Sequence, residues 1–128
     1  MDKGSPHAER RRHPRMSLDL PLEYRVMDAP YAHGGLVVNA SEVGLLIHSI
    51  RNIPIGSRLH IAVLFPQGFE LANFEVLAEI IWKDLYWEED WEGYRYGLKF
   101  IKILEDDRRK LIQILSSQFE SSEMSPRP

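Results

Sequence analysis

Two short stretches of the sequence carry the residues best suited to binding an anion. Residues 9–15 (ERRRHPR) contain four arginines, and residues 39–44 (NASEVG) combine an amide, a hydroxyl and a glycine. Arginine forms planar, bidentate bonds to anions such as phosphate. Glycine permits a bend of the backbone. Taken alone, the first stretch is also typical of a solvated basic tail, and the second of an ordinary turn.

The sequence offers little for catalysis or for metal binding. Cysteine is absent, which excludes disulfides, thiolate ligands and a cysteine nucleophile. The five histidines are scattered, with no pair at metal-ligand spacing on a helix, and no glycine-rich nucleotide loop is present. Ser41 lacks the flanking glycines of a nucleophile elbow. We therefore predict that the protein is not an enzyme and has no catalytic residue, metal ion or cofactor.

The charge is unevenly distributed along the chain. The net charge is −3, but residues 1–15 carry five cations and two anions, whereas the remainder carries 11 cations and 17 anions. A general polyanion binder spreads its Lys and Arg along one face. A basic end beside an acidic body indicates instead either a small, local anion site or a tail attracted to the acidic body, and it argues against binding to nucleic acid.

Apolar and polar residues alternate in a way that predicts about six short strands, as in a small barrel or sandwich. Period-two alternation or a short apolar run marks each strand, at residues 18–26, 36–38, 43–47, 59–65, 74–82 and 94–100. The fifth strand is predicted to carry Trp82 on the same face as Phe74 and Ile80. Pro21 suggests an edge position or a strand start, and the acidic, aromatic residues 84–93 are predicted to form a hairpin loop.

The period changes at residues 105–117, where an amphipathic helix is predicted. Its apolar stripe, at Leu111, Leu115 and Phe119 with Ile112 beside it, must lie on the barrel. The predicted fold is therefore all-β, a six-stranded antiparallel β-barrel with one C-terminal α-helix.

The length of 128 residues fits one domain. We assign it to residues 9–118, between a flexible tail at residues 1–8 and a disordered tail at residues 119–128. No apolar run approaches the roughly 20 residues that cross a bilayer, and no signal peptide opens the chain. We therefore expect a cytoplasmic protein with no membrane partner. The absence of cysteine suits the reducing environment of the cytosol.

The two stretches, in this order and ahead of this strand pattern, resemble the signatures of the PilZ domain family, R-x-x-x-R and [D/N]-x-S-x-x-G. The segment at residues 94–100 is similar to the closing strand of that family, and the resemblance covers residues 9–118. The matching positions are Arg11 and Arg15, preceded by Arg10, then Asn39, Ser41 and Gly44, with Trp82 ending the strand before the last.

The resemblance implies a six-stranded barrel that serves as a bacterial receptor for cyclic di-GMP, without catalysis. Arg11 and Arg15 would clamp phosphate and guanine, and Arg10 at this position is associated in the family with an intercalated dimer of the ligand. Ser41 would donate a hydroxyl, and Gly44 would leave room for the ligand.

Two of these positions carry a qualification. Trp82 either stacks on a base or belongs to the core or rim of the barrel. Asn39 offers one acceptor oxygen where an aspartate offers two charged ones, so weaker binding is expected than with aspartate.

The mechanism expected from the resemblance is an ordering of the basic arm. Residues 1–15 have no apolar face to pack, and ligand phosphates would fold them over the barrel mouth, changing the surface offered to a downstream protein in motility, biofilm or exopolysaccharide control. The alternative is a PilZ-like module that binds no ligand and interacts only with proteins, for which the acidic, aromatic segment 86–91 is a candidate surface.

Overall fold

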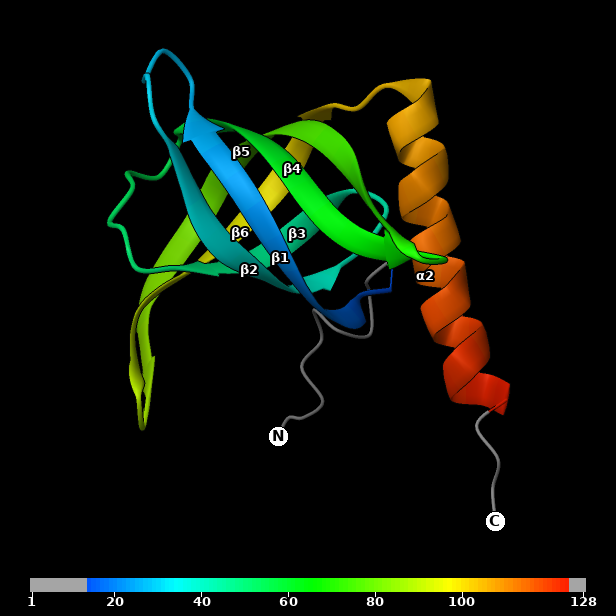
Figure 1. Cartoon of the computed structure of the whole chain (residues 1–128). Helices are drawn as coiled ribbons and strands as arrows, with labels where there is room; N and C mark the ends of the chain where they lie inside the picture. The colour runs from blue at the N-terminus through cyan, green and yellow to red at the C-terminus, as the bar shows by residue number, and fades with distance from the viewer. Residues whose placement is uncertain (1–13, 125–128) are drawn as a thin grey trace.

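The structure, a computed structural model, describes the backbone of residues 14–124 and the side chains of residues 14–117. Six strands are followed by one helix (Figure 1). These are β1 (Met16–Val26), β2 (Ala32–Ala40), β3 (Gly44–Ser49), β4 (Arg58–Gln67), β5 (Glu70–Glu88), β6 (Trp91–Lys102) and α2 (Glu105–Met124).

The six strands form one closed antiparallel barrel in the order β1-β2-β3-β6-β5-β4, and β4 pairs with β1 to close it. The predicted fold class is confirmed. Inward-facing side chains at alternate positions fill the interior, as the period-two pattern requires. The buried core includes Leu22, Val37, Leu45, Ile47, Ile61, Val63, Phe74, Ile80, Tyr96 and Leu98.

Pro21 lies within β1, opposite Leu36 of β2. Pairing of β1 with β4 begins only at Leu22. The proline therefore stands where β1 has no paired residue on the β4 side, which agrees with the predicted edge position.

A β-bulge in β5 changes which face Trp82 occupies. Ile80 pairs with Leu98 of β6, but Trp82 pairs with Gly97, so Ile81 is the extra residue. Ile80 is fully buried, whereas Trp82 is 37% exposed. The prediction that Trp82 shares a face with Phe74 and Ile80 is therefore wrong, because one inserted residue moves the following side chains to the outer surface.

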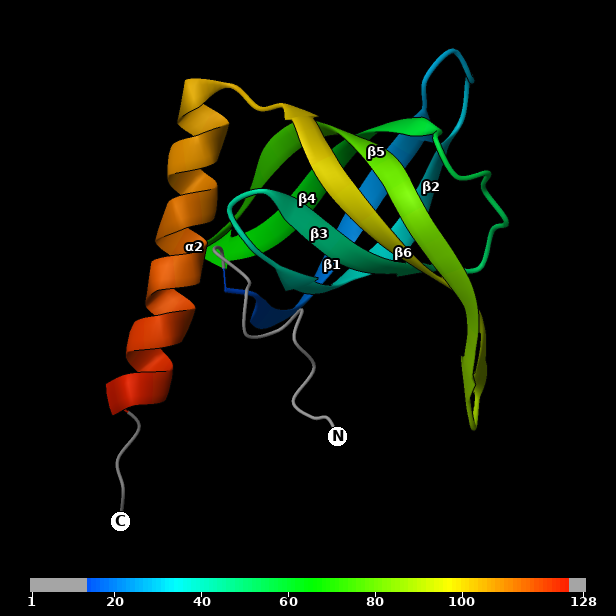
Figure 2. The same ribbon diagram turned by 180° about the vertical axis from the view of Figure 1, so that it is seen from behind.

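The segment at residues 84–93 is a regular two-stranded ribbon, not the predicted loop. β5 continues to Glu88 and β6 begins at Trp91, with residues paired up to Glu88 and Trp91 themselves. The ribbon projects from the barrel on the side away from the helix, as both views show (Figures 1 and 2).

The helix α2 lies along the side of the barrel and is attached to β5. Leu111 is completely buried. Asp107 Oδ1 accepts a hydrogen bond from the Glu75 backbone N–H at 2.9 Å, and Lys110 Nζ donates to the Asn73 carbonyl at 3.0 Å. Ile112 is 38% exposed, so it does not belong to the packed stripe.

The helix extends to Met124, beyond the predicted end at Ser117. Residues 119–124, predicted to belong to a disordered tail, are thus helical. The remaining tail predictions, for residues 1–8 and 125–128, lie outside the described residues, as does the side chain of Phe119.

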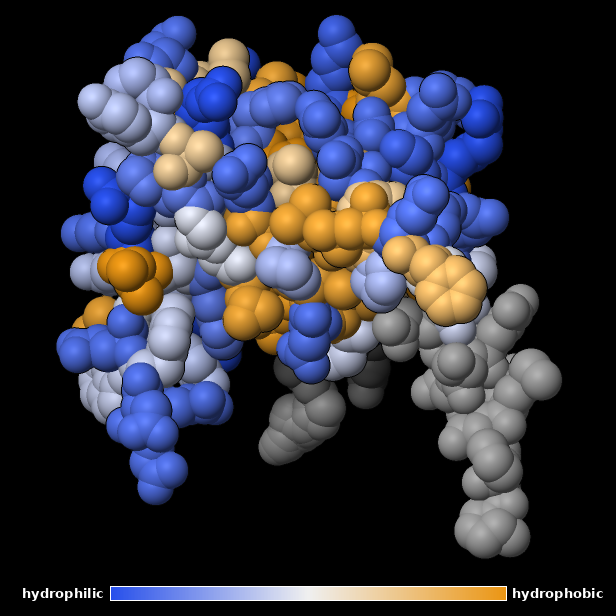
Figure 3. All heavy atoms as spheres, viewed as in Figure 1, coloured by the Kyte–Doolittle hydropathy of each residue, from blue (hydrophilic) through white to orange (hydrophobic). Residues whose placement is uncertain are grey.

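A groove lies between the middle of α2 and the strands β1 and β4. Leu20, Phe65, Pro66 and Ile114 line it together with polar residues of α2. Figure 3 shows hydrophobic side chains gathered on this face, over β1 and β4.

Within residues 14–124, no helix is both long and apolar enough to span a bilayer.

Candidate functional site

The start of β1 lies beside the end of β2, and this brings the two predicted stretches together. Met16 pairs with Ala40 and Ser17 with Asn39. Immediately before the strand, Arg15 Nη1 donates a hydrogen bond to Asn39 Oδ1 at 3.2 Å. The last arginine of the first stretch therefore contacts the first residue of the second. Arg10 and Arg11 lie outside the described residues.

The turn between β2 and β3 is closed by Ser41. The Ser41 N–H donates to the Gly44 carbonyl at 3.0 Å, and Ser41 Oγ accepts a hydrogen bond from the Val43 N–H at 3.2 Å. The residue is only 3% exposed. Its observed contacts are thus those of a turn-forming serine, although the hydroxyl keeps its own proton to donate.

Gly44 is required by strand packing. A Cβ at this position would lie 2.2 Å from the Leu98 carbonyl oxygen of β6, far inside van der Waals contact. The missing side chain therefore allows β3 and β6 to approach each other. Strand packing alone therefore explains why residue 44 is a glycine. The structure gives no evidence for the expectation that Gly44 leaves room for a ligand.

A row of paired residues runs across the outer surface from Asn39 to Trp82. Asn39 pairs with Leu46 of β3, Leu46 with Gly97 of β6, and Gly97 with Trp82 of β5. The neighbours of Leu46 in sequence, Leu45 and Ile47, are completely buried, so Leu46 and the residues paired with it face outward. Three strand spacings separate Asn39 from Trp82, about 14 Å. The row crosses four neighbouring strands in the order β2-β3-β6-β5, of which β3, β6 and β5 face the viewer in Figure 2.

The indole of Trp82 packs against the backbone of Gly97. A Cβ at Gly97 would lie 2.1 Å from Trp82 Nε1, so only glycine admits the ring in this position. With 37% of its surface exposed, Trp82 belongs to the outer surface and not to the core. It therefore lies on the same face as Asn39.

The same face continues into the ribbon as a cluster of aromatic and charged side chains, in which Tyr86 and Trp91 of the predicted partner segment meet His48 and Arg95, which the sequence did not single out. The ring of His48 in β3 stacks on Trp91 at 5.1 Å between centroids and contacts Tyr86 at 4.7 Å. The Arg95 guanidinium lies 4.7 Å from the centre of the Tyr86 ring. One signal in the sequence could have indicated this part of the cluster. Asp84, Tyr86 and Glu88 stand at alternate positions and so continue the period-two pattern of the strand.

Charge within this cluster is locally paired. Arg95 donates to both carboxylate oxygens of Asp84, at 2.9 and 3.2 Å, and these bonds lower the pKa of Asp84 below its ordinary value. Burial, followed by the nearby charge of Arg95, lowers the pKa of His48, although Glu88 and Asp84 act in the opposite direction. His48 is therefore held toward its neutral form. Among the described residues, no three His, Asp or Glu side chains converge in a way that could hold a metal ion.

Comparison with known proteins gives one family. A model described as the PilZ domain matches residues 9–117. The PilZ domain of YcgR from Escherichia coli, solved with c-di-GMP, has a TM-score of 0.70 and 18% identity, covering 91% of this chain and 96% of that chain. No curated protein matches.

Two larger proteins contain the same fold. The inhibitor of motility MotI/DgrA from Bacillus subtilis has a TM-score of 0.70 and 16% identity, covering 93% of this chain and 54% of its own. MrkH of K. pneumonia, a c-di-GMP-dependent transcription regulatory factor, has a TM-score of 0.68 and 15% identity, covering 85% and 51%. The chain thus spans about half the length of these two proteins, and at these identities the likeness establishes the fold.

The close approach of β3 and β6 at Gly44 can be tested by adding one methyl group. We expect Gly44→Ala to lower the free energy of unfolding by about 1–3 kcal/mol, because the new Cβ must displace the Leu98 carbonyl. Gly34→Ala is the matched control, since a Cβ there has no heavy atom nearer than 4.0 Å. Urea unfolding of both variants measures the difference, and equal stabilities would show that the seam tolerates a side chain.

The environment of His48 predicts a pH-dependent contribution to stability. Since the folded pKa lies below the unfolded value of 6.5, the unfolded chain binds the proton more readily, and the contribution is lost as the pH falls through 6.5 toward the folded pKa. The stability advantage of wild type over His48→Phe should therefore shrink from about pH 7 to about pH 5. An NMR titration of the His48 ring checks the cause directly, and an apparent pKa at or above 6.5 would contradict it.

Proposed function

Because the chain belongs to the PilZ domain family, we propose that it is a non-catalytic receptor for the second messenger cyclic di-GMP. The observation that carries this proposal is the hydrogen bond between Arg15 and Asn39, which joins the two motifs of the family at one place on the barrel. The bound ligand of the YcgR domain, and the dependence of MrkH on the same molecule, support the choice of ligand.

The chemistry of the side chains suits this ligand, which offers two phosphates and two guanines. Arg15 can exchange its bond to a neutral amide for a stronger bond to the negatively charged phosphate or for a bidentate bond to guanine. Arg11 supplies a second guanidinium from the preceding segment. Asn39 accepts through one oxygen only, so the affinity is expected to be lower than with aspartate at this position.

The position of Trp82 bears on how much ligand binds. It lies about 14 Å from Asn39 across β3 and β6, so a base stacks on it only if the ligand extends over both strands. We propose that Arg10 and Trp82 together favour two intercalated ligand molecules. Base–aromatic stacking of this kind contributes about 1–3 kcal/mol per base.

Signalling requires that binding change the surface that another protein meets. We propose that the ligand orders residues 1–15 over the barrel mouth, in the bacterial cytoplasm, and that a downstream protein in motility, biofilm or exopolysaccharide control binds the altered surface. The similarity to MotI/DgrA, an inhibitor of motility, supports motility control among these settings. A module that interacts with proteins alone is the second candidate, favoured by the exposure of Trp87 on the ribbon.

Isothermal titration calorimetry separates these functions. We expect Arg11→Ala and Arg15→Ala each to abolish measurable binding of cyclic di-GMP, because each removes a charged, bidentate donor, while the melting temperature stays nearly unchanged. Arg15→Lys should bind weakly, since it keeps the charge and loses the planar fork. Arg25→Ala is the matched control, because Arg25 is an exposed arginine near the other end of β1.

Titrations of GTP and of an oligonucleotide with the wild type test the selectivity of the site. Binding to the oligonucleotide but not to cyclic di-GMP would replace the receptor with a nucleic-acid-binding barrel. A wild-type isotherm for either alanine variant would refute the clamp. Failure of the wild type to bind any of the three leaves the protein-interaction module.

The ordering of the arm has its own test. Amide hydrogen exchange in residues 5–15 is expected to slow when cyclic di-GMP is added, because ligand-bound backbone amides open less often. The Ala29 amide, which donates to the Val26 carbonyl at 2.9 Å in the β1–β2 turn, serves as an internal reference at the other end of β1 from Asn39. Equal exchange with and without ligand in residues 5–15 would reject the ordering step even if calorimetry detects binding.

A further inference from the structure

The end of the β5–β6 ribbon extends beyond the barrel. Pairing between β3 and β6 ends at Ser49 and Tyr94, whereas β5 and β6 stay paired out to Glu88 and Trp91. The projecting part therefore has no third strand beside it. An isolated two-stranded hairpin is at best marginally stable in water, so this ribbon needs support from side chains.

The outer face of the ribbon provides that support through Trp91. Its ring stacks on His48 and contacts Tyr86 at 5.9 Å between centroids. Gly93 makes this possible, because a Cβ there would lie 2.7 Å from both the Ser49 carbonyl oxygen and the Trp91 ring. Trp91 thus folds back toward β3 and holds the ribbon in a fixed direction.

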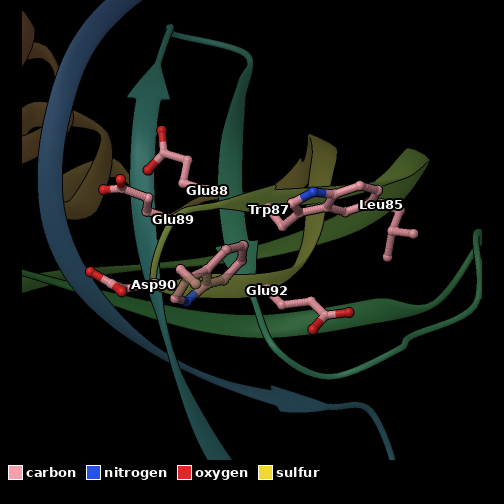
Figure 4. A pocket seen from close by; sticks show the side chains of 7 residues that line it. Leu85, Trp87, Glu88, Glu89, Asp90 and Glu92 are labelled. Carbon is pink, nitrogen blue, oxygen red and sulfur yellow. The ribbon is translucent and has the colours of Figure 1, made fainter.

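The opposite face of the ribbon exposes two large apolar side chains. Leu85 is 54% exposed and Trp87 is 61% exposed. Figure 4 shows the two side chains lying together on one side of the hairpin, beside a depression lined by residues 85 and 87–92. The two tryptophans of the ribbon therefore differ, since Trp91 is used by the fold and Trp87 is not. Exposed tryptophans on a rigid support are the residues that most often dominate a protein interface.

The charge at the tip restricts what can bind there. Glu88, Glu89, Asp90 and Glu92 all lie within five residues of Trp87 in the sequence, and no Lys or Arg occurs between Asp84 and Tyr94. Nucleic acid and anionic lipid surfaces would be repelled by this cluster. A protein surface with basic residues around an apolar pocket is complementary to it in both respects.

We propose that the ribbon is a docking arm for a basic protein partner, with Trp87 and Leu85 inserted into an apolar pocket and the acidic tip facing Lys or Arg. The docking arm rests on the proposed function in one respect only, namely that its partner is taken to be the downstream protein that responds to cyclic di-GMP binding. Recognition through the ribbon itself does not require cyclic di-GMP.

A library of random peptides displayed on phage, selected against the full-length chain, tests this assignment. Selected peptides are expected to combine Lys or Arg with apolar residues, and fluorescence anisotropy should show at least a roughly tenfold weaker affinity for Trp87→Ala. Affinity should also fall with added salt and in the double variant Glu89→Gln, Glu92→Gln, because part of the attraction is electrostatic. Leu85→Ser is a second variant that probes the same face without removing a ring.

Tyr31→Ala is the matched control, because Tyr31 is an aromatic residue 72% exposed outside the ribbon. Its affinity for the peptides should equal that of the wild type. Peptides that bind Trp87→Ala and Leu85→Ser as tightly as the wild type, acidic peptides, or an empty selection would overturn the proposal. Sedimentation of the wild type, but not of Trp87→Ala, with phosphatidylserine vesicles would overturn it in favour of a membrane.

The titration of cyclic di-GMP into Trp87→Ala separates this proposal from the proposed function. Wild-type ligand binding together with lost peptide binding supports a docking arm distinct from the ligand site. If the wild type binds the peptides but no cyclic di-GMP, the receptor function fails and the docking arm stands.

Discussion

The seam between β3 and β6 is the constraint on which the surface of this barrel depends. At three places along it only a glycine fits: Gly44 faces the Leu98 carbonyl, Gly97 receives the Trp82 ring, and Gly93 faces the Ser49 carbonyl and the Trp91 ring. One glycine closes the β2–β3 turn onto the barrel, and the other two let aromatic rings lie flat on the sheet. The candidate ligand site and the supported ribbon thus follow from close backbone packing at a single seam.

The barrel could be predicted from the sequence because alternation with period two directly encodes one buried face. The same logic failed at Trp82. Strict alternation from Ile80 predicts that Trp82 faces inward, and nothing in the sequence pattern indicates the β-bulge at Ile81. The ribbon was misjudged for a different reason: its acidic residues suggest a loop, although strands that leave the barrel need no buried face and therefore carry charged side chains on both sides.

The candidate site was predictable in part. The resemblance carried by the two motifs implies that the basic arm and the Asn39 turn bind the same ligand, and the Arg15–Asn39 bond brings their described parts together. The sequence could not show which role requires two of the motif residues, Ser41 and Gly44. Ser41 bonds within its own turn and Gly44 accommodates β6, so both have structural roles that a motif cannot separate from contact with a ligand. His48 was missed because its partners lie on another strand pair, at no fixed spacing in sequence.

The alternation of faces along β5 also explains how two binding events can coexist on one pair of strands. After the bulge, the side chains of Trp82, Asp84 and Tyr86 face the same side as Asn39, whereas Leu85 and Trp87 face the other. A ligand on the first face and a protein on the second would therefore not compete for the same atoms. They would still share the backbone of β5 and β6, whose pairing Gly97 and Gly93 keep tight. Any influence of one on the other has to pass through this backbone or through the His48 cluster, which is the packed contact between the ribbon and β3.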